Sequence, residues 1–261
     1  MGDPAGARPA VGAVRHGEGR GRRPVTSLAR RAIAEFVGTG LLVTIVIGSG
    51  IAAARLSPSD VGLQLAENAA ATAAGLAVII LMVGPVSGAH LNPVVSLVDW
   101  ALGRRGRTGL TGTSLGVYAL AQTMGAISGA VLANLMFDLP AVTISATVRT
   151  APSLWLAEAV ATAGLVALVL SLTRTGRAHL AAPAVGAYIG SAYWFTSSTS
   201  FANPAVTIGR IFSDTFAGIA PVSVAPFIAA QLAGAFAGAA LALILHPVAA
   251  PSTAPASKEF A

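Results

Sequence analysis

The sequence has no cysteine and few charged residues. The absence of cysteine excludes disulfides, thiolate nucleophiles and zinc sites built on Cys ligands, and it leaves no indication of the redox compartment. Only 10% of the 261 residues are charged, whereas a soluble domain carries roughly a quarter. In contrast, 54% are hydrophobic, and the mean hydropathy is +0.74. Because such a chain is suited to lipid, the composition excludes a conventional cytosolic enzyme.

Six apolar runs reach the length of about 20 residues that crossing a bilayer requires. They lie near residues 32–54, 66–84, 113–137, 154–173, 178–197 and 222–246. Two shorter apolar segments, Leu91 to Leu102 and Phe201 to Phe212, have about half of that length, and each has Asn-Pro near its start. Proline is favoured in the first turn of a helix, so these segments are predicted to be half-helices that begin inside the membrane.

The distribution of basic residues predicts the orientation of the chain. Of the 16 Lys and Arg residues, only Arg55, Arg149 and Arg210 fall on one side of the membrane if the chain crosses six times. Cytoplasmic segments carry the excess of Lys and Arg, so both termini are expected to be cytoplasmic, in a multi-pass protein of the plasma or inner membrane. Topology then accounts for the net charge of +6, and no nucleic-acid partner is expected.

A single membrane domain is expected over residues 30–247. Residues 1–29 are rich in Gly, Pro and Arg and are predicted to form a disordered basic tail, and residues 248–261 are predicted to form a second one. Within the domain, three landmarks occur twice in the same order. They are Glu35 and Glu158, Asn92-Pro93 and Asn203-Pro204, and Gln122 and Gln231.

These landmarks divide the domain into repeat 1, about residues 30–137, and repeat 2, about residues 154–247. Each repeat crosses the membrane an odd number of times, so the second is inverted relative to the first. The expected fold is an all-α membrane protein with six transmembrane helices and two re-entrant half-helices. Inversion brings the two half-helices in from opposite faces, so that their positive N-terminal ends meet near the midplane, where they favour neutral or partly negative oxygens over cations.

The two Asn-Pro segments resemble a known pair of motifs. Ser87-Gly88-Ala89-His90-Leu91-Asn92-Pro93-Val94 and Phe201-Ala202-Asn203-Pro204-Ala205 are similar to the two Asn-Pro-Ala boxes of the major intrinsic protein family, the aquaporins and aquaglyceroporins. Glu35, within Ala-Glu-Phe-Val-Gly-Thr, also matches the first span of that family, and the resemblance covers roughly residues 30–247. It implies a homotetramer with one pore per subunit in the lipid bilayer, which passes water and small neutral solutes, needs no cofactor or metal and is not an enzyme.

The resemblance also implies roles for individual residues. Asn92 and Asn203 would donate hydrogen bonds to the passing molecule. Backbone carbonyls before each box would line the path, at Gly88, Ala89 and His90 in the first loop and at Ser200, Phe201 and Ala202 in the second. Glu35 and Glu158 would brace the two re-entrant loops without taking part in chemistry, and Gln122 and Gln231 are expected to be structural as well.

The sequence departs from the family pattern in both boxes. The first box ends in Val94, where the family has Ala, whereas the second ends in Ala205 as expected. The next position, where the narrow filter of the family has Arg, is Val206. By the family's spacing, the other filter positions fall on Thr72, Ser191 and Ser200, with Ala74 as an alternative to Thr72.

A filter of these small residues has no bulky aromatic and no fixed cation, so it is expected to be wide. Such a filter favours glycerol, urea or uncharged metalloid hydroxides such as arsenous acid. Bacterial family members associated with arsenic resistance look similar around Phe-Ala-Asn-Pro-Ala-Val.

Three readings stay open from the residues alone. Arg210 lies one helical turn beyond Val206, where it either replaces the missing filter cation or forms a vestibule contact, such as a salt bridge with Asp214. His90 is either a packed loop residue or part of a gate or metal site. The rival functions are a secondary transporter that uses Glu35 and Glu158 as coupling acids, and a purely structural membrane protein.

Overall fold

The computed structural model describes residue 2, residues 26–104 and residues 106–247, and these residues contain helices and no strands. The helices are α1 (Leu28–Leu56), α2 (Val61–Ser87), α3 (Pro93–Gly103), α4 (Gly112–Met136), α5 (Pro152–Arg174), α6 (Ala181–Phe195), α7 (Pro204–Gly209) and α8 (Val224–Leu245), with short 3-10 turns η1 (Ala178–Leu180), η2 (Arg210–Phe212) and η3 (Pro221–Ser223). The two predicted tails lie almost entirely outside the described residues.

The six predicted spans are all helical. Helices α1, α2, α4, α5 and α8 are each long and apolar enough to cross a membrane. Helix α6 has 15 residues and continues directly from η1. Together they form about 29 Å of helix, which matches the thickness of the hydrocarbon core of a bilayer. The chain is therefore an all-α, multi-pass membrane protein, as the hydrophobic runs predict.

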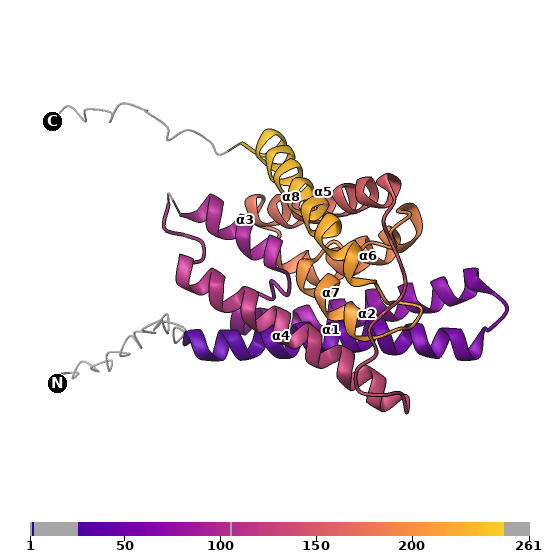
Figure 1. The fold of residues 1–261 in the computed structure, drawn as a ribbon. Helices are drawn as coiled ribbons and strands as arrows, with labels where there is room; N and C mark the ends of the chain where they lie inside the picture. The colour runs from indigo at the N-terminus through magenta and orange to yellow at the C-terminus, as the bar shows by residue number, and fades with distance from the viewer. Residues whose placement is uncertain (1, 3–25, 105, 248–261) are drawn as a thin grey trace.

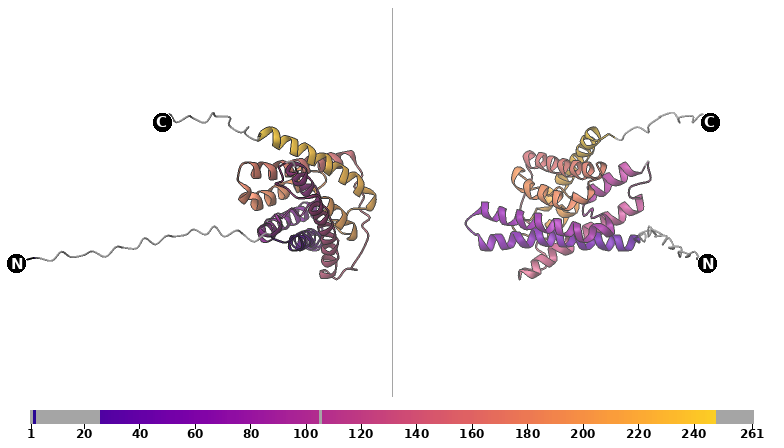
Figure 2. Two further views of the ribbon diagram at one scale, coloured as in Figure 1. Left: turned by 90° about the vertical axis from the view of Figure 1, so that its left-hand side faces the viewer. Right: turned by 180° about the vertical axis from the view of Figure 1, so that it is seen from behind.

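The helices form two groups that correspond to the two repeats. Figure 1 shows α1, α2 and α4 on one side of the molecule and α5, α6 and α8 on the other. The half-helices α3 and α7 lie between the groups, since each contacts both α4 and α8. Helix α1 begins and α8 ends on the same side of the molecule in both orientations (Figures 1 and 2), which we call the terminal side.

Asn and Pro start both half-helices. The side-chain oxygen of Asn92 accepts a hydrogen bond from the Val94 N–H at 3.0 Å, and that of Asn203 accepts one from the Ala205 N–H at 3.0 Å. Pro93 and Pro204 follow directly in the first helical turn, where the missing N–H costs no intrahelical bond. The predicted half-helices therefore form where the sequence places them, one of 11 residues and one of six extended by η2.

Small residues allow close helix contacts within each group. A side chain on Gly129 of α4 would collide with the carbonyl of Gly40 in α1, and one on Gly238 of α8 would collide with the carbonyl of Ala163 in α5. The Thr44 hydroxyl also donates to the Gly129 carbonyl across the first contact, at 3.1 Å. The same small-residue packing thus joins α1 to α4 and α5 to α8.

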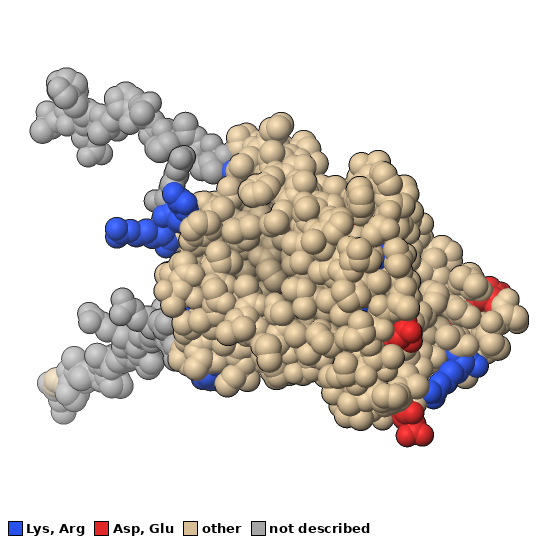
Figure 3. Space-filling view, viewed as in Figure 1, with Lys and Arg blue, Asp and Glu red and all other residues tan. Residues whose placement is uncertain are grey.

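The surface is suited to lipid. On the face shown in Figure 3, charged side chains gather towards the two ends of the molecule, and a broad uncharged band lies between them. Large apolar side chains are exposed on this fold, including Val78, Leu120, Leu156 and Ile244. Such exposure is favourable in a bilayer, which solvates the apolar faces that water would not.

We expect Gly129→Val to separate α4 from α1. The added side chain meets the Gly40 backbone, and overpacking of this kind costs about 1–3 kcal/mol. Gly116→Val in the same helix is the matched control, because nothing lies within 4 Å of its added Cβ while its cost in helix propensity is the same. The thermal unfolding midpoint in detergent should fall much further for Gly129→Val, and equal shifts would contradict the close contact.

Candidate functional site

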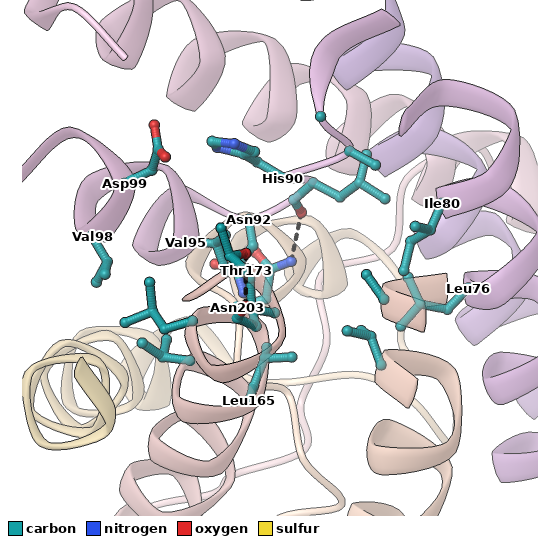
Figure 4. A pocket seen from close by; sticks show the side chains of 18 of the residues that line it. Leu76, Ile80, His90, Asn92, Val95, Val98, Asp99, Leu165, Thr173 and Asn203 are labelled. Atoms are coloured by element: carbon teal, nitrogen blue, oxygen red, sulfur yellow. Dashed lines mark hydrogen bonds between the residues drawn. The ribbon is translucent and has the colours of Figure 1, made fainter. Parts of the chain in front are cut away.

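The two half-helices meet through their capping asparagines. The Asn92 side-chain amide donates to the carbonyl of Ala202 at 2.7 Å, and the Asn203 amide donates to the carbonyl of Leu91 at 2.7 Å. Both asparagines are buried, and they lie next to each other in the close-up of the site (Figure 4). Each box is thus tied to the loop of the other, at the centre of the molecule.

One donor remains on each asparagine. Each side-chain oxygen caps its own helix, and one amide proton is used by the opposite loop. A primary amide has two N–H donors, so Asn92 and Asn203 each retain a second one. Both residues line the cavity described below, which places these donors beside open space.

The loops before the boxes have a shared and strained conformation. Ala89 and Leu91 have φ of 50° and 53°, and Ser200 and Ala202, at the equivalent positions, have φ of 50° and 48°. Left-handed φ costs roughly 1–2 kcal/mol for a residue with a side chain. Such strain persists only where the surroundings compensate for it.

Glu158 compensates for the backbone strain in the second loop. Its two oxygens accept hydrogen bonds from the N–H groups of Phe201 and Ala202, both at 2.9 Å. The Gln231 amide donates to the same carboxylate at 2.7 Å and to the Thr207 hydroxyl at 2.9 Å. Glu158 is fully buried and lies away from both cavities described below.

Glu35 has the same role in the first loop. It accepts hydrogen bonds from the N–H groups of His90, at 3.0 Å, and Leu91, at 2.6 Å. Gln122 donates to Glu35 at 2.7 Å and to Ser96 at 3.1 Å. The structure therefore gives both Glu–Gln pairs loop-bracing geometry and leaves neither carboxylate beside the path.

Two cavities meet at the boxes. The larger, about 270 Å³ in volume, reaches Thr173 at the end of α5 and Ala178 in η1, so it lies on the terminal side. The smaller, about 40 Å³, lies on the opposite side and reaches Arg210. We call them the inner and outer cavities. They share four lining residues, Leu42, Leu76, Ile189 and Asn203, which define a largely apolar junction with one amide donor.

The predicted path-lining residues before the boxes are mostly beside these cavities. Gly88, Ala89 and His90 line the inner cavity, and Phe201 lines the outer one. Ala202 differs from the expectation that its carbonyl lines the path. It is fully buried and lines neither cavity, and its carbonyl accepts from Asn92, which ties the two loops together.

Three of the predicted filter residues line the outer cavity: Thr72, Ser200 and Val206. The alternative to Thr72, Ala74, lies on an exposed face. Ser191 does not line the outer cavity either: it is exposed, and its hydroxyl donates to the Ala187 carbonyl of its own helix at 2.9 Å.

Tyr193 lines the outer cavity where Ser191 was expected, and its hydroxyl lies 3.2 Å from that of Thr72. Two residues along a helix differ by about 200° in direction, so a two-residue error in spacing selects the opposite face. The helical pattern contains the missed signal, since Val185, Ile189 and Tyr193 recur every fourth residue on the buried face of α6.

Arg210 also lines the outer cavity. It is only 2% exposed, and its Nε donates to the Ala217 carbonyl. The predicted salt bridge with Asp214 is absent from the described structure, because that carboxylate instead accepts from the Ala146 N–H at 3.0 Å. With Tyr193 and Arg210 present, the outer cavity has both an aromatic residue and a cation, contrary to the expectation of neither.

His90 is packed in the first loop. Its Nδ1 lies 3.1 Å from the Ser96 hydroxyl, and its ring meets the Tyr118 ring edge-on at 5.4 Å between centroids. No group of three or more potential metal ligands occurs among the residues that the structure describes. The geometry favours the packed-loop reading of His90.

Known proteins are similar to this chain in sequence and in fold. The sequence pattern of the major intrinsic protein family matches residues 23–202. Aquaglyceroporin AqpS of Rhizobium meliloti is 49% identical over 90% of this chain and 97% of its own. The glycerol uptake facilitator protein of Pseudomonas aeruginosa is 31% identical over 77% of this chain and 79% of its own. The solved aquaglyceroporin from Plasmodium falciparum superposes with a TM-score of 0.63 at 19% identity, covering 85% of this chain and 97% of that one.

We expect Glu158→Gln to destabilise the second loop. The amide that replaces one oxygen faces the donors that Glu158 now satisfies, and each unsatisfied buried donor costs about 1–3 kcal/mol. Glu67→Gln is the control, since the hydrogen bond recorded for the Glu67 carboxylate comes from one hydroxyl, that of Ser57. The unfolding midpoint should fall clearly further for Glu158→Gln, and similar midpoints for the two variants would argue against the brace.

Proposed function

Because the chain belongs to the major intrinsic protein family, whose members are channels and not enzymes, we propose that it is a passive transmembrane channel for water and small uncharged solutes. The observation that carries this proposal is the pair of reciprocal bonds from Asn92 to Ala202 and from Asn203 to Leu91. They hold two re-entrant half-helices end to end at the junction of two cavities on opposite sides of the molecule.

The junction supports passage of neutral molecules that carry oxygen. Apolar walls at Leu42, Leu76 and Ile189 offer no competing hydrogen bonds, while Asn92 and Asn203 each offer one free donor to a solute oxygen. The positive ends of half-helices are a known barrier to protons and cations in aquaporin-type pores, and α3 and α7 both begin here.

The solutes that we propose are glycerol-like polyols and neutral metalloid hydroxides such as arsenous acid. Val206 leaves the outer cavity without Arg at the position after the second box. The names of two relatives, an aquaglyceroporin and a glycerol uptake facilitator, support the polyol assignment. The proposed filter is atypical in composition: it has Val206 at the family's Arg position, and Tyr193 and Arg210 also line this cavity.

The geometry is unfavourable to a secondary transporter. Coupling acids must exchange protons or ions with the transport path, whereas Glu35 and Glu158 line neither cavity. Their oxygens accept hydrogen bonds from loop N–H groups and glutamine amides.

We further propose a homotetramer in the plasma or inner membrane with cytoplasmic termini. The resemblance to the family supports the tetramer. The excess of Lys and Arg in the sequence segments that six crossings assign to the side of the termini supports the orientation.

Flux through purified protein in proteoliposomes tests the channel. Glycerol uptake should run only down its gradient, rise linearly with concentration over a wide range and be unchanged by protonophores and ionophores. The variant with Asn92→Ala and Asn203→Ala together should lose at least tenfold, because both free donors and both loop ties are removed. Uptake that collapses with a proton or sodium gradient, or a double variant as permeable as the parent, would refute a passive pore at this site.

We expect Val206→Arg to narrow the outer cavity, which Val206 lines directly. Stopped-flow permeability to glycerol and arsenous acid should fall severalfold relative to that for water. Val142→Arg is the matched control, because Val142 is half exposed in the loop before α5. If Val206→Arg passes glycerol and arsenous acid as fast as the parent, Val206 does not form part of the constriction.

A further inference from the structure

We propose that Arg210 supplies the fixed cation of the outer constriction, from a position one turn beyond Val206, and so excludes protons and small cations there. This inference rests on the proposed channel function and adds a specificity-determining residue to it.

The course of the chain after the second box brings Arg210 back to the path. Helix α7 ends at Gly209, and the tighter turn η2 begins with Arg210. Residues four apart lie on one face of a helix, and Val206 and Arg210 both line the outer cavity. The cation is therefore displaced along the chain by four residues and still reaches the same space.

The guanidinium of Arg210 is held in one orientation. Its central carbon lies 3.5 Å from the centroid of the Phe201 ring, and its Nε donates to the carbonyl of Ala217. Phe201 is itself held at its backbone, whose N–H donates to Glu158 at 2.9 Å, and at its ring, which meets that of Phe227 edge-on at 5.3 Å between centroids. A planar cation stacked on an aromatic ring and bonded at one edge has few rotamers left, so its charge is preorganised.

The remaining donors of Arg210 have no acceptor among the residues that the structure describes. A guanidinium has five N–H donors, and within the described parts of the chain Nε is the one guanidinium nitrogen with a hydrogen-bond acceptor. The Ser200 hydroxyl, which lines the same cavity, is buried and also lacks a partner. Buried polar groups normally have partners, so these two side chains are suited to a transient one, the oxygen of a passing solute.

No carboxylate faces Arg210 within the outer cavity. Asp and Glu are absent from its lining among the described residues, Asp214 bonds to the Ala146 N–H, and the buried Glu158 accepts hydrogen bonds from its loop donors outside the cavity. The nearby Arg149 contacts the same ring from outside the cavity, with its guanidinium 5.2 Å from the Phe201 ring centroid and its Nε donating to the Gly218 carbonyl at 3.0 Å. An entering cation therefore meets the positive charge of Arg210 in a narrow cavity with no carboxylate in its lining.

A purely structural role for Arg210 would also explain its bond to Ala217. The test must therefore distinguish the effect of the Arg210 charge on cations from its support of the loop. The variants are Arg210→Met, Arg210→Met with Val206→Arg, and Arg149→Met. Arg149→Met is the matched control, because Arg149 also contacts the Phe201 ring but does not line the outer cavity. Each is reconstituted in proteoliposomes, where proton leak is read with an enclosed pH dye, methylammonium entry by the same dye, and glycerol uptake by light scattering.

We expect Arg210→Met to raise proton or methylammonium permeability at least tenfold, while glycerol uptake falls by less than that, because Asn92 and Asn203 still offer donors to the solute. Val206→Arg in that background should return the leak to within about twofold of the parent, because it restores a cation to the same cavity from the neighbouring turn. Arg149→Met should stay within twofold throughout. Such rescue by charge is not expected of a residue that only supports the loop at Ala217.

The proposal is overturned if Arg210→Met passes glycerol and excludes cations as well as the parent does. It is also overturned if the added Val206→Arg leaves the leak unchanged. Should Arg210→Met fail to assemble, Arg210→Lys decides: it keeps the charge but not the Nε bond, so retained exclusion supports the proposal and a tenfold leak contradicts it. If the parent itself passes no glycerol, the channel proposal fails, which is a separate result.

Discussion

Two buried carboxylates hold the centre of this protein together. Glu35 and Glu158 each accept two consecutive backbone N–H groups from a re-entrant loop, and a glutamine amide secures each carboxylate from behind. The loops need this support because they contain left-handed residues such as Leu91 and Ala202. In lipid, a backbone N–H without a partner is costly, so the same bonds that fix the conformation also allow non-helical backbone inside the membrane.

The inverted repeat follows from this arrangement and is visible at the level of single bonds. Each Asn caps its own half-helix and donates to the opposite loop. Each half uses a glutamine that bridges the buried carboxylate to a hydroxyl, Ser96 in one half and Thr207 in the other. Glycine contacts join α1 to α4 as they join α5 to α8. Because one set of interactions is used twice in opposite directions, the two cavities meet at its centre.

The two halves differ where selectivity is expected. Helix α3 continues for 11 residues towards the terminal side, whereas α7 ends after six and turns into η2. The loop before α5 then packs on this turn, with the Ser145 N–H donating to the Ile211 carbonyl at 2.8 Å. The inner cavity is consequently the larger, and the outer one is confined by Tyr193 and Arg210.

The sequence by itself determined the spans, the half-helices, the repeat and the family, because these depend on local features: runs of apolar residues, Asn-Pro at a helix start, and paired Glu and Gln landmarks. It also identified Thr72, Ser200 and Val206, which line the outer cavity. Only the tertiary structure decided that Tyr193 lines the outer cavity while Ser191 does not, that Ala202 bonds to Asn92, and that Arg210 lines the outer cavity without pairing with Asp214. The physical reason is rotation. A shift of two residues along a helix turns a side chain by about 200°, to the opposite face, and the sequence of a loop does not fix where the next helix begins to within two residues.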